Sequence, residues 1–253
     1  MKKIFWKILI VAVVLIVIAA IVGAFFLDSI VKKGVETVGP KITKVSIDLD
    51  EIHIGLLTGS AKVKGLVVGN PDGYKAPHAI SVGLAEIGVN PFTVLSDKIV
   101  VHSIHVESPE ITFEGGLSGN NLSAIMDNVD GTAQQGGPVV TNSAGKPKSA
   151  RKIEVDDFLI TGAKVHVILT QLGGKEMTLP LPQIHLTDLG KGGDGLTPTE
   201  LTRAVFEAII SGTTKAVADA VTKLDVTKGA EQLKQSGQGL LNSAGKGIGN
   251  LFK

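Results

Sequence analysis

The sequence predicts a mainly β protein with one N-terminal transmembrane helix and a C-terminal amphipathic helical tail. Three observations carry this prediction: an uncharged apolar run at residues 8–27, alternating apolar and polar residues with glycine turns up to about residue 189, and helical apolar spacing thereafter. The chain has 31 glycines, one Trp and one Tyr, a composition more typical of a β protein than of a helical enzyme. We therefore divide it into an anchor (1–28), a β domain (29–190) and a glycine-rich tail (191–253).

The apolar run at residues 8–27 is long enough to cross a bilayer. As a helix, its twenty uncharged residues rise roughly 30 Å. Three lysines precede the run and Asp28 follows it, so the positive-inside rule places the N-terminus in the cytoplasm and the body on the other side. A cleaved signal peptide, with Val22 and Ala24 as small residues before the cut, is the alternative. Both interpretations export the body.

Inside the β domain, one apolar spacing recurs five times, with apolar residues at offsets of 0, 2, 5 and 7. Polar or small residues mark each phase change, as at His102–Ser103 and Asp156–Asp157. A β-bulge at the phase change keeps all four apolar side chains on one face and bends the strand. We therefore predict a strongly curled antiparallel sheet of bulged strands; a tight turn at each phase change, giving more and shorter strands, is the alternative. The predicted apolar face consists of Ile47, Leu49, Ile52, Ile54, Val63, Leu66, Val68, Val82, Leu84, Ile87, Val89, Ile99, Val101, Ile104, Val106, Ile153, Val155, Phe158 and Ile160.

Two stretches match beyond this spacing. KIVVHSIHVESPEITF at residues 98–113 aligns with KIEVDDFLITGAKVHV at residues 152–167, which indicates a repeated unit. Between them, residues 120–129 predict a short helix. Residues 131–151 have no aromatic and no acidic residue and are rich in Gly, Ser, Thr, Gln and Pro, so we predict a flexible excursion there.

The tail predicts a capped helix that weakens toward its end. Thr197 is an N-cap candidate, and Glu200 stands three residues later, as in a capping box. Apolar residues then recur at helical spacing, but glycines interrupt the pattern after residue 226. That half is predicted to be a poor helix in water unless it orders against a membrane, a partner or the β domain.

The sequence offers little for catalysis. The absence of cysteine excludes disulfides, thiolate zinc sites and cysteine nucleophiles, and a net charge of +1 gives no indication of a nucleic-acid partner. We expect His102 and His105 to be solvated strand histidines rather than metal ligands. We interpret Asp156–Asp157 as a polar bend rather than a catalytic pair. We therefore predict no enzyme, no cofactor and no metal site.

The stretches GLVVGNPDGY, VNPFTVLSDKIVVHSIHVESPEITFE and NNLSAIMDNV, which follow an apolar N-terminal segment, resemble the N-terminal portion of AsmA-like proteins of Gram-negative envelopes. The resemblance covers roughly residues 4–190. It implies a curled β-sheet with an apolar groove, and larger members of the family are implicated in phospholipid movement between two membranes. It also implies a single-pass protein of the bacterial inner membrane with its body in the periplasm. The chain is shorter than the large members, and its glycine-rich tail is not part of the family pattern.

Two functions are consistent with these features. The first is the binding or movement of lipid acyl chains, with phospholipid as the partner, in a groove lined by the predicted apolar face, which would serve outer-membrane or envelope homeostasis. The second is a non-enzymatic assembly scaffold whose tail, residues 198–253, docks on a membrane, on another copy of the chain or on an envelope partner. A tail packed inside the sheet would favour the scaffold, and an open apolar face would favour lipid.

Overall fold

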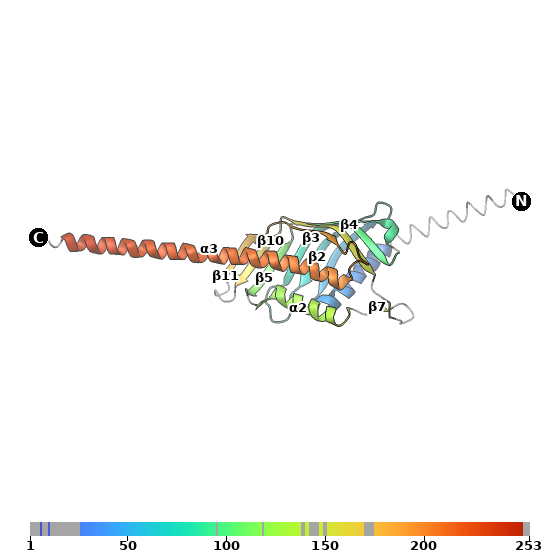
Figure 1. Ribbon diagram of the computed structural model, residues 1–253, viewed down its shortest axis with the longest axis horizontal. Coiled ribbons are helices and arrows are strands. Elements are labelled where there is room, and N and C mark those ends of the chain that lie inside the picture. Colours follow the sequence, from blue (N-terminus) through green and yellow to red (C-terminus); the bar gives the residue numbers. More distant parts are fainter. Residues whose placement is uncertain are drawn as a thin grey trace. The chain divides into compact units, whose positions relative to one another are not determined.

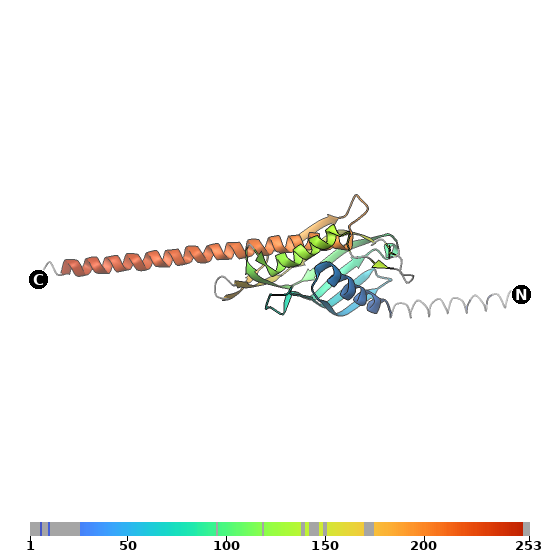
Figure 2. The same cartoon turned by 90° about the horizontal axis from the view of Figure 1, so that it is seen from below.

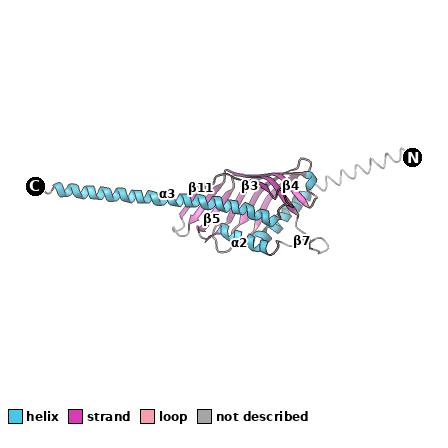
Figure 3. Cartoon of the chain, viewed as in Figure 1, coloured by secondary structure: helices cyan, strands magenta, loops and turns pink. Residues whose placement is uncertain are grey.

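The computed structural model describes residues 6, 10, 26–94, 96–117, 119–137, 140–141, 147–148, 151–169 and 175–249, with side chains up to Lys223. Two compact units result, Met1–Thr213 and Thr214–Lys253. Strands and helices both contribute to the first unit (Figure 3). The predicted anchor falls almost wholly outside the described residues. None of the described helices combines the length and apolar character needed to cross a membrane.

A ten-stranded sheet, strongly curled into a half-barrel, forms the framework of the first unit (Figure 1). Its strands are β1 (Ile47–Gly55), β2 (Ser60–Gly69), β3 (His78–Val89), β4 (Lys98–Glu107), β5 (Glu110–Gly116), β6 (Gly119–Asn120), β9 (Lys152–Thr161), β10 (Lys164–Leu169), β11 (Lys175–Pro180) and β12 (Ile184–Leu189). The short strands β7 (Val140–Thr141) and β8 (Pro147–Lys148) pair separately, within the predicted excursion. The predicted curled, mainly β fold is confirmed.

The sheet is mixed, whereas an antiparallel sheet was predicted. β4 pairs in parallel with β9, and β5 pairs in parallel with β10. Lys98 faces Lys152 and Glu110 faces Lys164, so the two repeated stretches lie side by side in the register of their sequence alignment. Parallel neighbours require a long crossover connection, and helix α2 (Asn121–Gln134) lies in that connection.

Three pairs of successive strands form single long ribbons. β4 and β5 are the first pair. Both pair with β3, and the register does not change from one to the other, since Ser81 faces Glu110 and Leu84 faces Glu107. β9 and β10 continue one another in the same way beside β4 and β5, as do β11 and β12 beside them. Each ribbon is interrupted where one strand ends and the next begins, and the alternation of its side chains changes phase there.

These interruptions lie in one row across the sheet, which we call the crease. Its residues are Asp50, Gly65, Gly83, Ser108, Gly162 and Pro182. Gly65, Ser108 and Gly162 have positive φ angles of 62°, 48° and 65°. The pairs on both sides of the crease keep one register, so each facing strand leaves one residue unpaired. The predicted bends are confirmed, because each of the five repeats is one continuous strand. At Asp50 and Gly65 the predicted bulge was wrong, because the register does not change there. In β4 it is confirmed, because the register between β3 and β4 shifts beside the predicted phase change His102–Ser103.

Leu84 is the one predicted face residue whose placement is wrong. It faces Lys64 on one side and Glu107 on the other, and directly opposed residues share a face. Its neighbour Ala85 instead faces Val63 and Val106 and is buried. The phase of β3 changes at Gly83, two residues earlier than the prediction placed it, so Leu84 lies on the outer face.

Three helical segments lie on the inner face of the sheet (Figure 2). Residues 26–43 are helical, α2 contacts β5 and β6, and α3 (Pro198–Gly249) begins over the far edge, where Gly212 approaches Leu181 and Ile184. Arg203 of α3 forms an ion pair with Asp130 of α2 (2.8 Å). The tail was expected to be a poor helix after residue 226, but α3 continues to Gly249.

The helix of residues 26–43 also covers the edge of β1. The backbone N–H of Ile54 donates to Asp28 Oδ1 (3.0 Å) and that of Leu49 donates to Glu36 Oε1 (3.3 Å). Lys32 Nζ donates to the carbonyl of Asp50 (2.9 Å). Side chains of one helix thus take up backbone groups that an edge strand otherwise leaves open to pairing.

The start of α3 confirms the predicted capping box. Glu200 N donates to Thr197 Oγ1 (3.2 Å), while Glu200 Oε2 accepts from Thr197 N (2.6 Å) and from its hydroxyl (2.9 Å). The bond from the Thr197 backbone, followed by that from its side chain, holds the pKa of Glu200 below its ordinary value. The ionised form is therefore the one that stabilises the fold.

We expect Glu200→Gln to lower the free energy of unfolding by roughly 0.5–1 kcal/mol at neutral pH. A lowered pKa gives stability that is present above the ordinary pKa of the group and is lost as the pH falls through the lowered one. The difference between the two proteins should therefore vanish in acid. Urea unfolding followed by circular dichroism at neutral and acidic pH measures it. Glu207→Gln, at an exposed position of the same helix, is the control; an equal loss there contradicts the assignment.

Candidate functional site

An apolar cavity of about 260 Å³ lies on the inner face, between the helix of residues 26–43 and one end of the sheet. Among the described residues that line it, Ser60 has the only polar side chain and none is charged. The lining residues are Leu27, Val31, Ile52, Ile54, Gly55, Leu56, Gly59, Ser60, Ala61, Ile87, Val89, Pro91, Val94 and Ile99. Such a lining has affinity for hydrocarbon and offers no group for acid–base chemistry.

Five residues of the predicted apolar face reach this cavity: Ile52, Ile54, Ile87, Val89 and Ile99. Register explains why they meet. Ile54 faces Ala61, which faces Ile87, which faces Ile104, so their side chains share the inner face across four strands. Except for Ile52, the five are only half buried. The side chains of these four residues therefore still expose part of their apolar surface.

The fourteen other residues predicted for this face do not line the cavity. Eight of them are buried: Leu49, Val68, Val82, Val101, Val106, Val155, Phe158 and Ile160. Helix α2 and the start of α3 supply a covering layer with buried Leu122, Ile125, Phe206 and Ile209. Much of the predicted face therefore serves as an ordinary core, and the apolar cavity lies at the end near residue 27. The assignment of the whole face to lipid stays a prediction.

The opposite wall of the cavity was missed by the sequence analysis. Leu27 and Val31 stand four residues apart and so face one side of their helix. Leu27 was assigned to the end of the anchor, and Val31 was given no role. The i, i+4 spacing just after the apolar run was the available signal. Pro91 and Val94 come from the 3₁₀ helix η1 (Pro91–Thr93) and its C-cap, in a segment used only for the family resemblance.

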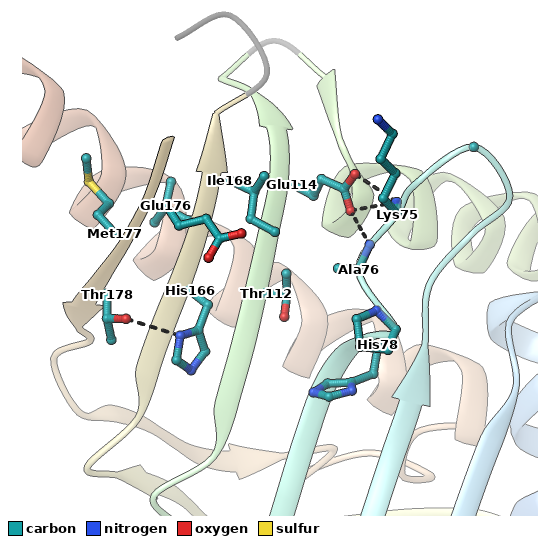
Figure 4. A pocket seen from close by; sticks show the side chains of 13 residues that line it. Lys75, Ala76, His78, Thr112, Glu114, His166, Ile168, Glu176, Met177 and Thr178 are labelled. Atoms are coloured by element: carbon teal, nitrogen blue, oxygen red, sulfur yellow. Dashed lines mark hydrogen bonds between the residues drawn. The ribbon is translucent and has the colours of Figure 1, made fainter. Parts of the chain in front are cut away.

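A second and larger hollow, of about 840 Å³, lies toward the other end of the sheet (Figure 4). Its lining mixes polar and apolar side chains: Thr112, His166 and Thr178 face one another across β5, β10 and β11. His166 Nδ1 lies 3.2 Å from Thr178 Oγ1. Glu114 is buried, and its two carboxylate oxygens accept from the backbone N–H groups of Lys75 and Ala76 (2.8–2.9 Å). This carboxylate is occupied in holding the β2–β3 loop.

The histidines and paired aspartates of the repeats have partners on neighbouring strands. His102 Nδ1 lies 3.1 Å from Asp156 Oδ2, and His185 Nε2 lies 2.6 Å from Asp157 Oδ1. Spacing along the sequence did not indicate a carboxylate beside His102; the parallel pairing of β4 with β9 brings Asp156 next to it. The two aspartates contact different partners, as a polar bend requires. Among the described residues, no group of three or more His, Asp or Glu is arranged to hold a metal.

The AsmA family model matches residues 1–181. The chain belongs to the AsmA family. A comparison with curated proteins and one with solved structures each found no match. In broad terms, AsmA membership and the curled half-barrel fit an envelope-associated, lipid-related function. The matched range ends at Leu181, so α3 lies beyond it.

The AsmA match includes every strand that lines the apolar cavity, together with the helix of residues 26–43. Both walls of the cavity therefore belong to the AsmA portion of the chain. The hollow of Figure 4, with its mixed lining, also lies within this range. Of the two, only the apolar cavity has a lining suited to hydrocarbon.

Proposed function

We propose that this AsmA family protein is anchored in the bacterial inner membrane with its body in the periplasm, and that its cavity shelters part of a lipid acyl chain. The observation that carries the proposal is the cavity itself, an almost wholly aliphatic space at an end of the sheet. Its wall includes Leu27, the last residue of the apolar run that is predicted to cross the membrane. A lipid leaving the bilayer would meet this space first.

The size of the cavity limits what it holds. Sites for drug-sized ligands measure roughly 300–1,000 Å³, so about 260 Å³ suits one stretch of hydrocarbon chain and not a whole phospholipid. The headgroup and the second chain would remain outside. This favours local capture of a lipid at the membrane surface. Movement of lipid over a longer distance would need further copies or a further protein.

The scaffold function is supported by a different observation. The start of α3 packs on the inner face of the sheet, where Phe206 and Ile209 are buried and Gly212 approaches Leu181 and Ile184. Protein thus fills a part of the face that the lipid function alone would leave open. α3 then continues to Gly249, which leaves a long helix for a partner.

Native mass spectrometry of the full chain, purified with its endogenous lipids, tests the lipid function. We expect bound phospholipid in the unaltered protein and a severalfold lower bound fraction in Ala61→Phe, whose ring would occupy the cavity. Val89→Thr adds one hydroxyl with nearly the same shape, and burying it against hydrocarbon costs about 1–3 kcal/mol, so it should weaken binding without altering the fold. Leu84→Phe, on the outer face of β3, is the matched control. A lipid-free unaltered protein, or equal lipid content in all four, contradicts the proposal and leaves the scaffold.

A further inference from the structure

Two turns beside the cavity present large apolar side chains to solvent. Leu57, in the β1–β2 turn, is 100% exposed, and Phe92, in η1, is 93% exposed. Leu56 is also exposed and lines the cavity with its inner side. Turns normally carry polar residues at such positions. Removing a Leu or Phe side chain from water is favourable, and neither of these two side chains is buried by the fold.

The two turns form one surface. Val89 N, just before η1, donates to Gly59 O in the β1–β2 turn (2.6 Å). A side chain on Gly59 would come within 3.0 Å of Pro91, so the turns are in close contact. Figure 1 shows η1 at the end of the sheet where the helix of residues 26–43 begins, and Leu27 shares the cavity with Leu56 and Pro91. Phe26, in the first turn of that helix, is exposed as well.

Both turns are held firmly by hydrogen bonds. Asn90 Oδ1 accepts from Phe92 N (3.1 Å), and Thr93 Oγ1 donates to Asn90 O (2.8 Å) while accepting from Val100 N (3.0 Å). In the other turn, Thr58 Oγ1 donates to Gly55 O (3.1 Å). The backbone that carries Leu57 and Phe92 is therefore already ordered. Binding of these side chains to a surface does not have to offset the conformational entropy of ordering the turns.

We propose that Leu56, Leu57 and Phe92 form a docking surface that inserts into the interface of a lipid bilayer. Two observations favour lipid over a protein partner. The helix that borders this surface begins inside the run of twenty uncharged residues, 8–27, which is predicted to cross the membrane. Arg151 lies beside η1, where Nη1 donates to Val94 O (2.6 Å); a basic group next to an apolar tip matches a layer of headgroup phosphates above hydrocarbon.

Docking at this surface would turn the end of the sheet that holds the cavity toward the membrane. It gives the body one orientation, in which Leu56 links the bilayer surface to the cavity wall. The inference goes beyond the proposed function. It rests on the proposed membrane anchor but not on lipid in the cavity, because the exposed tips can insert whether or not the cavity holds a chain.

The chain contains no cysteine, so single cysteines can be placed and labelled cleanly. We expect an environment-sensitive fluorophore on Leu57→Cys or Phe92→Cys, in the full chain reconstituted into phospholipid nanodiscs, to be quenched strongly by brominated phospholipids. Leu117→Cys is the matched control, since Leu117 is exposed in the β5–β6 turn at the opposite end of the strands. Its label should be quenched severalfold less.

Equal quenching at the three positions overturns the docking surface. A blue-shifted emission at Leu57→Cys and Phe92→Cys without bromolipid quenching also overturns it, because that result indicates a protein environment, such as a second copy of the chain. Lipid content, measured on the same labelled samples by native mass spectrometry, reports separately on the cavity. Failure of docking and failure of lipid binding are therefore distinguishable.

Discussion

Asn121→Leu is expected to cost about 2–4 kcal/mol of unfolding free energy, since it leaves buried polar groups without partners. Asn121 is fully buried at the start of α2. Its Nδ2 donates to Thr112 O and to Asn70 Oδ1 (both 2.8 Å), and its Oδ1 accepts from Glu114 N (2.9 Å). Leucine has nearly the same shape but makes none of these bonds.

The loss should spread beyond α2. Asn70 Nδ2 also donates to Ala76 O (2.8 Å), and Glu114 holds Lys75 and Ala76 through their backbone N–H groups. Asn121 thus joins α2, β5 and the β2–β3 loop. Urea unfolding of the full chain measures the change, and hydrogen exchange should show faster opening of residues 70–77. Asn128→Leu is the control, because this half-buried residue of the same helix makes one bond, from Nδ2 to Thr43 O (3.0 Å). Equal losses in both variants contradict the assignment.

Gly65→Ala is expected to destabilise the protein by about 2–4 kcal/mol, because it strains the crease. Gly65 has a φ angle of +62°, a conformation that costs any residue with a Cβ about 1–2 kcal/mol. A Cβ at this position would also collide with the Asp50 side chain on the facing strand. The free energy of unfolding, measured in urea, should fall accordingly.

Gly83→Ala is the matched control from the same row of the sheet. Gly83 faces Gly65 between the pairs Lys64–Leu84 and Leu66–Val82, but its φ is not positive and a Cβ there would meet nothing within 4 Å. We expect a change within about 0.5 kcal/mol. A loss at Gly83 as large as that at Gly65 would show that the crease does not depend on backbone conformation at Gly65.

The strands and bends could be predicted because apolar spacing reports which side chains a sheet buries. The same spacing misplaced Leu84, because residues 80, 82, 84, 85, 87 and 89 are all apolar and Gly83 has no side chain to mark the phase. Parallel pairing of the repeats was not predictable, because sequence similarity between residues 98–113 and 152–167 does not show that the two stretches are adjacent in the sheet.

The cavity was predictable only on its sheet side. Ile54, Ile87 and Ile99 follow from the strand pattern, but helix coverage over the rest of the face depends on tertiary packing that local spacing does not encode. The Asn70–Glu114–Asn121 network was missed for a related reason. Its members are polar residues far apart in the sequence, and single-sequence patterns assign such residues to the surface.

Two carboxylates of the helix of residues 26–43 determine where this sheet can grow. Asp28 and Glu36 accept hydrogen bonds from backbone N–H groups of β1. A strand that pairs with this edge must first break these charge-assisted bonds. The helix of residues 26–43 therefore hinders the pairing of a further chain with β1. Any lengthening of the half-barrel by added strands is directed to the β11–β12 margin. The side chains of Asp28 and Glu36 thus determine which edge of the sheet is available for added strands.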